Sequence, residues 1–266
     1  AANSKGEFVL LNGNQTAVIL SYYILSQYRE KRLLKGNEYI IKTIVTTDLI
    51  DKIAADYGIK CYNVLTGFKF FAELIKKLEG KERFIGGGEE SYGFLPGDYV
   101  RDKDAVASCA LAAEVLVWAK SRDLDLFGLL DEIYLKYGVY RERLINIVRK
   151  GKEGADEIKA MMKGYRDNPP VSINNSRVVM IKDYKELVST DLLSGTKSAI
   201  DLGRSDVLQF FLEDGSKISV RPSGTEPKIK FYFSVSMMPQ SAGDIENTGS
   251  LLEKRIDGII ADLKLT

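Results

Sequence analysis

Short runs of β-branched and aromatic residues alternate with helically spaced apolar positions between residues 8 and 128. The runs predict buried strands at residues 39–45, 59–65 and 83–85, and the helical spacing predicts helices at residues 48–57 and 68–78. Gly58 directly follows the first of these helices, where glycine is common. Strands and helices that alternate over short connections favour an α/β domain, with a mainly parallel sheet between helices.

Two more helices are predicted in the same region. One follows Asn14, a favourable N-cap residue, and its apolar face holds Val18, Tyr22 and Leu25. The other follows Asp104, and its apolar positions at helical spacing are Val106, Ala110, Ala113 and Val117. We expect this last set to form the buried stripe of its helix, with Cys109 close to it.

The second half of the chain has a different pattern. It predicts strands at residues 177–181, 207–212, 217–220 and 228–235, and helices at residues 155–165 and 245–265. Glu213-Asp214-Gly215-Ser216 is a hairpin-type turn between two of the strands. Consecutive strands flanked by helices favour a smaller α+β domain with a mainly antiparallel sheet. We therefore divide the chain into domains at residues 1–137 and 138–266.

Composition excludes several classes of function. The 266 residues include no histidine, which rules out Ser-His-Asp and Cys-His nucleophiles within this chain. The 38 Lys and Arg residues nearly balance 37 Asp and Glu residues, which argues against a nucleic-acid or membrane partner. No apolar run approaches the roughly 20 residues of a spanning helix. Two cysteines without C-x-x-C spacing are best accommodated in a reducing cytoplasm.

A glycine-rich loop with two carboxylates follows the third predicted strand. Residues 86–94 read GGGEESYGF, and neither the dinucleotide fingerprint nor a P-loop fits them. Glycines allow a ligand to approach the backbone, while Glu89, Glu90 and Ser91 supply groups that suit the hydroxyls of a polyol. A flexible strand-to-helix connection with solvated acids accounts for the composition equally well.

A second loop, residues 219–228, combines turn residues with cations. Pro222, Ser223 and Gly224 suit a β-turn, so a simple hairpin is one interpretation. The other interpretation is a phosphate site, to which Arg221, Ser223, the Gly224 amide and Thr225 contribute, and in which Lys228 and Lys230 raise the positive potential.

Two shorter segments carry weaker signals. Residues 98–104 alternate in charge, which by itself is typical of a solvated stretch, and residues 66–69 form another strand-to-helix turn. In α/β sheets such turns at the carboxyl ends of strands are where ligands bind.

Together these segments resemble the α-D-phosphohexomutase superfamily, most closely its phosphoglucomutase-2-like branch. The motifs are LNGNQT at 11–16, TGFKFF at 66–71, GEESYG at 88–93 and RPSGTEPK at 221–228. The resemblance implies a reaction in which an enzyme phosphoserine phosphorylates a hexose phosphate, the bisphosphate reorients, and the other phosphate returns to the serine.

The resemblance also implies roles for particular residues. The residues expected to contact the sugar are Thr66, Glu89, Ser91 and Lys103. The residues expected to hold the phosphate are Arg221, Ser223, Gly224, Thr225 and Lys230. Lys103 is in addition a candidate electrostatic stabiliser or proton-transfer partner. Other branches carry a histidine where this chain has Gly93, so a histidine general acid from this loop is excluded.

Two parts of the family pattern are absent from the sequence. A Ser-His-Asn serine loop cannot occur without histidine, and there is no D-x-D-x-D-R metal loop. The chain therefore resembles domains three and four of the family's four. We expect Mg²⁺ to be bound by the missing N-terminal domains, no metal in this chain, and weak hexose phosphate binding without catalysis. The alternatives are a non-catalytic phosphosugar-binding or regulatory module and, third, a nucleic-acid-binding protein. Glucose and mannose substrates remain equally compatible.

Overall fold

A computed structural model describes residues 1–2, 6–149, 151–224 and 226–265. The chain divides into two compact units. The first comprises Ala1–Gly138 with Met238–Ile245, and the second comprises Val139–Met237 with Glu246–Thr266.

The first unit is built on a four-stranded sheet between helices. Its strands are β1 (Glu38–Thr43), β2 (Lys60–Val64), β3 (Arg83–Gly88) and β4 (Phe94–Leu95). They lie in the order β2-β1-β3-β4; β1 pairs in parallel with β2 and β3, and β4 is antiparallel to β3. The mainly parallel sheet predicted from the sequence is thereby confirmed.

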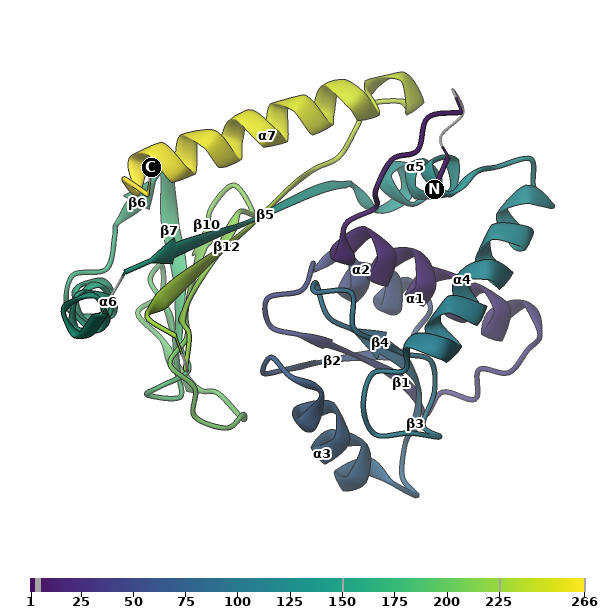
Figure 1. Ribbon diagram of the computed structural model, residues 1–266, viewed down its shortest axis with the longest axis horizontal. Coiled ribbons are helices and arrows are strands. Elements are labelled where there is room, and N and C mark those ends of the chain that lie inside the picture. The colour runs from purple at the N-terminus through teal and green to yellow at the C-terminus, as the bar shows by residue number, and fades with distance from the viewer. Residues whose placement is uncertain (3–5, 150, 225, 266) are drawn as a thin grey trace. The chain divides into compact units, whose positions relative to one another are not determined.

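Helices cover both faces of this sheet (Figure 1), and every residue of β1 is buried. The helices are α1 (Gly13–Glu30), α2 (Leu49–Asp56), α3 (Phe68–Leu78), α4 (Ala105–Lys120) and α5 (Leu126–Tyr137). Figure 1 shows α3 on one face of the sheet and α1 and α2 on the other. Under α3 the core includes Phe68, Phe71 and Ile75, packed with Tyr39 and Phe84 from the strands.

The predicted start of α1 is wrong by two residues. Asn12, not Asn14, is the N-cap: its side chain accepts from the Gln15 amide, and the Gln15 side chain accepts from the Asn12 amide. This reciprocal capping box satisfies two amides at once. The Asn14 side chain instead accepts a hydrogen bond of 2.9 Å from the Thr47 amide.

The predicted buried stripe of α4 is also wrong. Asp104 does cap the helix, accepting from the Ala107 amide at 3.0 Å. The side chains at the four predicted positions are exposed, however, and so is Cys109, whereas Val115 and Ala119 are buried. Because α4 is apolar around most of its circumference, helical spacing alone could not identify the side that faces the core.

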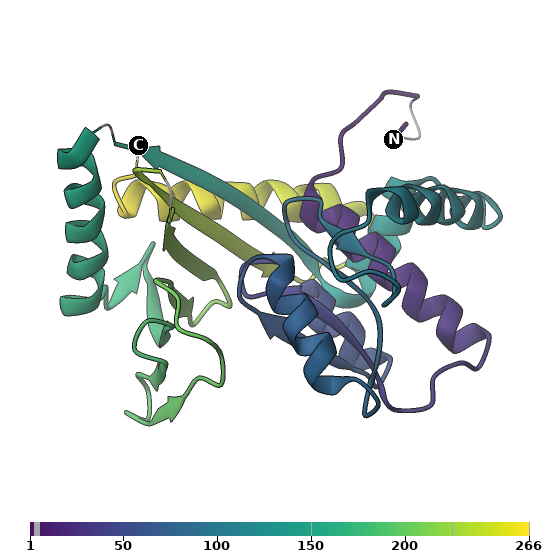
Figure 2. The ribbon, with the colours of Figure 1, turned by 60° about the horizontal axis from the view of Figure 1, so that its bottom comes forward.

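The second unit holds a long antiparallel sheet, as predicted. Its strands are β5 (Val139–Val148), β6 (Ser172–Ile173), β7 (Ser176–Asp183), β8 (Val188–Asp191), β9 (Lys197–Ala199), β10 (Leu208–Leu212), β11 (Lys217–Pro222) and β12 (Lys228–Met237). The order is β5-β12-β11-β10-β7-β8-β9, with β6 paired to β7. Figure 2 shows the long strands β5 and β12 side by side. The apolar pattern does not predict β5, because charged residues interrupt the apolar ones in this strand.

The helices α6 (Gly151–Asp167) and α7 (Ile245–Asp262) pack on one face of this sheet; a short 3₁₀ turn, η1 (Ala242–Asp244), precedes α7. Tyr165 of α6 makes ring contacts with Phe210 and Phe231. Arg143 of β5 pairs with Glu253 of α7 on the same face. Since side chains alternate along a strand, Arg221 and Lys230 belong to the opposite face.

Candidate functional site

The acidic loop begins where β3 ends, at the carboxyl edge of the parallel sheet. Its backbone closes on itself, because the Glu89 amide donates to the Gly93 carbonyl at 2.8 Å. The Glu89 carboxylate accepts a 2.7 Å hydrogen bond from the Gly67 amide. The loop and the turn at Thr66 and Gly67, which are far apart in the sequence, are therefore joined through the Glu89 side chain.

Phe68 lies between this loop and Lys103. A Cβ at Gly93 would come within 2.7 Å of the Phe68 ring and 3.4 Å of the Glu89 carboxylate, so the loop approaches the ring closely. The Lys103 ammonium lies 5.6 Å from the centre of the same ring and 3.0 Å from Asp102. Glu89 and Lys103 thus lie on either side of the Phe68 ring, which follows Thr66 and Gly67 in the chain, while Ser91 is exposed at the loop tip.

Glu90 faces a different environment from Glu89. Its carboxylate accepts from the hydroxyls of Thr43 at 3.3 Å and Thr46 at 3.1 Å, and these two hydroxyls are 2.8 Å apart. Both threonines are fully buried. The composition of the loop does not distinguish the two carboxylates, and only the family resemblance assigns Glu89 to the sugar; the structure makes Glu90 an anchor of the loop. The signal available in the sequence was the cluster of threonines at the carboxyl end of β1.

The start of α1 supports the loop from another side. A Cβ at Gly13 would lie 1.9 Å from the Glu90 carbonyl oxygen, so only glycine allows this approach. The Tyr92 hydroxyl donates to the Leu11 carbonyl at 3.1 Å. The loop is therefore held by α1 and by the segment after β1, two elements that also belong to the rigid sheet and helix framework.

Lys42 fixes the segment that carries these threonines. Its fully buried ammonium lies 2.9 Å from Asp48, 3.0 Å from Asp51 and 3.2 Å from the Thr46 carbonyl oxygen. Burial alone would lower the pKa of Lys42, but Asp48 and then Asp51 more than offset it, so the pKa lies above its usual value. Lys42 therefore stays charged and holds Thr46 in place beside Glu90.

The second predicted loop connects β11 and β12. Arg221 lies directly opposite Lys230 in the strand register, and the Ser223 amide donates to the Lys228 carbonyl at 2.8 Å. Lys228 also pairs with Glu226 and holds the pKa of that carboxyl below its usual value. Thr225 lies outside the described residues. Two cations opposite each other on one face are unfavourable unless an anion lies between them.

The hairpin thus brings together Arg221, Ser223 and Lys230, with Gly224 exposed beside them. The predicted β-turn at Pro222, Ser223 and Gly224 begins too early in the chain, because Pro222 still pairs with Ile229 as part of β11. The residues that would contact a phosphate therefore extend from the end of the strands into the loop.

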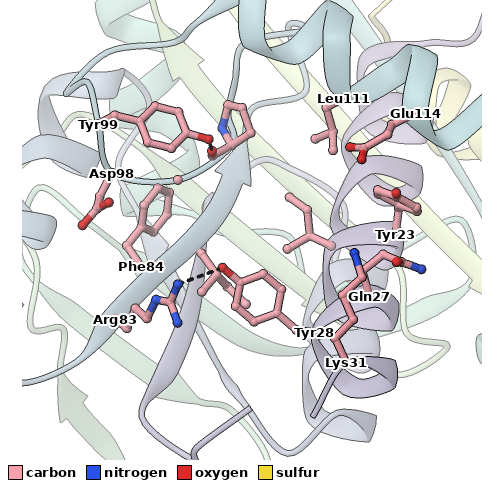
Figure 3. A pocket seen from close by; sticks show the side chains of 14 residues that line it. Tyr23, Gln27, Tyr28, Lys31, Arg83, Phe84, Asp98, Tyr99, Leu111 and Glu114 are labelled. Carbon is pink, nitrogen blue, oxygen red and sulfur yellow. Dashed lines mark hydrogen bonds between the residues drawn. The ribbon is translucent and has the colours of Figure 1, made fainter. Parts of the chain in front are cut away.

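A cavity of about 260 Å³ lies elsewhere in the first unit (Figure 3). Among its lining residues are Tyr28, Arg83 and Tyr99, and Arg83 donates to the Tyr28 hydroxyl at 3.4 Å. Arg83 begins β3, whereas the acidic loop follows the end of that strand. Over the described part of the chain, this lining includes none of the predicted site residues.

The described residues do not form a metal site. No group of three or more Asp, Glu, Cys or His side chains among them could hold a metal ion. In the same part of the chain, no helix combines the length and the apolar character needed to cross a bilayer.

Comparison with known families matches both units. A family model described as phosphoglucomutase/phosphomannomutase, alpha/beta/alpha domain III, covers residues 12–137. The model for the C-terminal domain of the same family covers residues 144–238. The fold and the two loops define an α/β domain followed by an antiparallel α+β domain of the phosphohexomutase type. The chain belongs to the phosphoglucomutase/phosphomannomutase family.

Curated relatives are similar over most of this chain. A phosphoglucomutase of Staphylococcus haemolyticus is 33% identical over 247 residues, which make up 92% of this chain and 44% of that protein. A phosphoglucomutase of Staphylococcus aureus strain MRSA252 is 35% identical over 233 residues, or 88% of this chain and 41% of that protein. The chain spans less than half the length of these relatives.

Solved structures share the fold at lower identity. Parafusin, a phosphoglucomutase of Paramecium, superimposes with a TM-score of 0.60 at 19% identity and covers 95% of this chain and 42% of its own. A phosphomannomutase-like protein from Thermus thermophilus gives a TM-score of 0.51 at 16% identity, over 93% of this chain and 41% of its own.

Proposed function

We propose that this chain is the part of a phosphohexomutase that recognises a hexose phosphate. The acidic loop of the first unit contacts the sugar hydroxyls through Glu89 and Ser91, with Thr66 and Lys103 beside them. The β11–β12 hairpin binds the phosphate through Arg221, Ser223, Gly224, Thr225 and Lys230. The observation that carries the proposal is the position of Arg221 directly opposite Lys230, where β11 and β12 run into the loop, within the part of the chain that matches the family's C-terminal domain.

The chemistry of each loop supports its role. A carboxylate can accept hydrogen bonds from two adjacent hydroxyls, and the Gly67 amide orients that of Glu89. Arginine binds a phosphate through two parallel hydrogen bonds, each contributing about 1.5–3 kcal/mol. Lys230, directly across from Arg221, adds a second positive charge.

In the longer protein, the proposed reaction moves a phosphoryl group between C1 and C6 of the hexose by way of a phosphoserine and a bisphosphate. In this proposal the nucleophilic serine and the Mg²⁺ site lie in the part of the longer protein outside this chain. Mg²⁺ would neutralise charge on the transferred group. The residues of this chain bind and orient the sugar in both of its orientations, and Lys103 is a candidate to stabilise developing charge. The isolated chain therefore binds without turnover.

We place the protein in the cytoplasm, where its two free cysteines would stay reduced. Its partners in this proposal are hexose phosphates and the remaining domains of the longer protein, and neither nucleic acid nor a membrane has a role.

Calorimetric titration with glucose 1-phosphate, glucose 6-phosphate and inorganic phosphate tests the proposal. We expect Arg221→Ala to weaken all three, and Glu89→Gln to weaken only the two hexose phosphates. Absence of saturable binding by the wild-type chain would refute the proposal.

A coupled assay with glucose 1-phosphate and glucose 1,6-bisphosphate tests whether this chain can catalyse phosphoryl transfer by itself. Mg²⁺-dependent turnover by this chain alone would show that it carries its own nucleophile. If hexose phosphates bind and the gene encodes no serine loop or acidic metal loop, the chain is instead a non-catalytic phosphosugar-binding or regulatory module.

A further inference from the structure

The cavity in Figure 3 lies between α1, the start of β3 and α4, and every residue that lines it belongs to the first unit. We call it the α1–α4 cavity. Three of its residues, Tyr23, Gln27 and Lys31, lie one turn apart at the C-terminal end of α1. At 1.5 Å per residue, this row extends over about 12 Å. With a volume of about 260 Å³, the cavity therefore suits a ligand that has recognised groups at two ends.

Apolar and aromatic side chains form the walls of the α1–α4 cavity. Ile24 and Phe84 are buried, and Leu111 lines the cavity from α4. Figure 3 shows Phe84 and Tyr99 on one side and Leu111 and Tyr23 on the other. Nucleobases stack on aromatic side chains in such surroundings. The walls therefore suit a flat aromatic ring better than a sugar, whose hydroxyls would face carbon atoms.

One end of the cavity presents a hydrogen-bond donor and an acceptor. Tyr23 is 6% exposed, and its hydroxyl has no hydrogen-bond partner among the described residues. Burial, and then the nearby Glu114, raise the pKa of Tyr23, so the hydroxyl keeps its proton near neutral pH. The Glu114 carboxylate makes no hydrogen bond or ion pair with any residue that the structure describes. Because buried polar groups are normally paired, this end suits a ligand group that donates an N–H to Glu114 and accepts from Tyr23.

The other end presents two cations. The Arg83 guanidinium lies 5.4 Å from the centre of the Tyr28 ring and donates to the Tyr28 hydroxyl at 3.4 Å. Neither Arg83 nor Lys31 forms an ion pair within the described part of the chain. Asp98 also lines the cavity, but Figure 3 shows its carboxylate directed away from Tyr28 and Lys31. An arginine with paired donors and a lysine with a compact charge are groups that bind phosphate.

We propose that the α1–α4 cavity binds a nucleoside monophosphate of the adenine type. The amino group and the adjacent ring nitrogen of adenine meet Glu114 and Tyr23. The phosphate lies at Arg83 and Lys31, and the ribose lies beside Gln27. A sugar phosphate would leave the aromatic walls uncovered, and an amino acid is too short to reach both ends. Among the described residues, none from the acidic loop or the β11–β12 hairpin lines this cavity, so the site is separate from the proposed hexose phosphate site.

Calorimetric titration of the 266-residue chain with adenosine monophosphate tests the proposal. Three probes each lack one recognised group: adenosine lacks the phosphate, ribose 5-phosphate lacks the base, and purine riboside monophosphate lacks only the amino group. We expect saturable one-to-one binding of adenosine monophosphate, and binding at least about tenfold weaker for each of the other three. Trp118 reports where the ligand binds: its ring lies 5.3 Å from that of Tyr23, so its fluorescence should change during the titration.

Variants of the cavity sharpen the test. Leu111→Trp fills the cavity and should abolish binding, whereas Val117→Trp adds the same ring at a position of α4 that is 70% exposed and should leave binding unchanged. Lys31→Met changes an exposed side chain, so it should weaken adenosine monophosphate about tenfold and leave adenosine unchanged. Glu114→Ala should remove the preference for adenosine monophosphate over purine riboside monophosphate.

Four results would overturn the proposal. They are no saturable binding of adenosine monophosphate, equal binding of ribose 5-phosphate, unchanged binding in Leu111→Trp or Lys31→Met, and loss of binding in Arg221→Ala. The last would place the nucleotide phosphate at the β11–β12 hairpin. Hexose phosphate titration of the wild-type chain tests the proposed function separately, so either proposal can fail alone.

Discussion

Replacing Glu90 by alanine should destabilise the first unit by removing the acceptor of two buried threonine hydroxyls. A hydrogen bond to a charged group contributes about 1.5–3 kcal/mol. The hydroxyls of Thr43 and Thr46 contact each other and both contact Glu90, which makes three contacts for only two hydroxyl protons. The contact between the two hydroxyls, at 2.8 Å, is the shortest and uses one of these protons. Glu90 therefore receives about one full hydrogen bond, and we expect Glu90→Ala to cost about 1.5–3 kcal/mol.

The single tryptophan makes this measurement specific. Trp118 is the only tryptophan in the chain and lies in α4, so its fluorescence reports unfolding of the unit that contains the loop. With a urea dependence of about 1–3 kcal/mol per molar, a loss of about 2 kcal/mol lowers the midpoint by about 1 M. Glu90→Gln keeps an acceptor oxygen without the charge and should fall between wild type and Glu90→Ala.

Two controls test the physical reasoning. Glu73→Ala removes an exposed carboxylate from α3 and should change stability by no more than about 0.5 kcal/mol. Thr46→Val combined with Glu90→Ala should cost less than the sum of the single changes, because both remove the same hydrogen bond. An unchanged urea midpoint in Glu90→Ala, or full additivity in the double variant, would refute the role of Glu90 as an anchor.

Three further predictions concern other contacts. Gly13→Ala should weaken hexose phosphate binding while sparing inorganic phosphate in calorimetry, since the new methyl group displaces the Glu90 backbone; equal weakening of both would contradict this. Arg221→Lys should lose part of the affinity for inorganic phosphate and Arg221→Ala more, because lysine keeps the charge but not the paired donors; equal affinities would count against a phosphate site there. The pKa of Lys42 is raised in the folded chain, so its ion pairs contribute their full stability at any pH below the unfolded pKa of about 10.4, and this stability is lost as the pH rises further. The free energy of unfolding, followed by Trp118 fluorescence, should therefore fall at alkaline pH, and it should fall less in Lys42→Met. We expect Lys42→Met itself to cost less than the about 3–5 kcal/mol of breaking a fully buried pair, because Asp48 is 41% exposed. An identical alkaline fall in both proteins would refute the charged state of Lys42.

Local pattern was sufficient for most of the first unit. The bounds of α3 match the predicted helix at residues 68–78, because a strong apolar period coincides with a glycine turn before it. For β3 the prediction stopped at Ile85, whereas the strand continues to Gly88. The glycines have little intrinsic preference for a strand, and pairing with β1 keeps them extended. Backbone pairing between distant segments is not encoded in a single local run.

For the candidate site, the sequence alone predicts two loops and the chemical groups that they carry. The local pattern by itself could not separate Glu89 from Glu90, because the Gly67 amide before α3 and the Thr43 hydroxyl of β1, which distinguish them, come from other parts of the chain. The same limit applies to α4, whose apolar residues surround the helix. Turn chemistry and short motifs depend on neighbours in the chain, and the sequence determines them. The partner of each carboxylate and the buried side of an apolar helix depend on neighbours in space, so only the tertiary structure decides them.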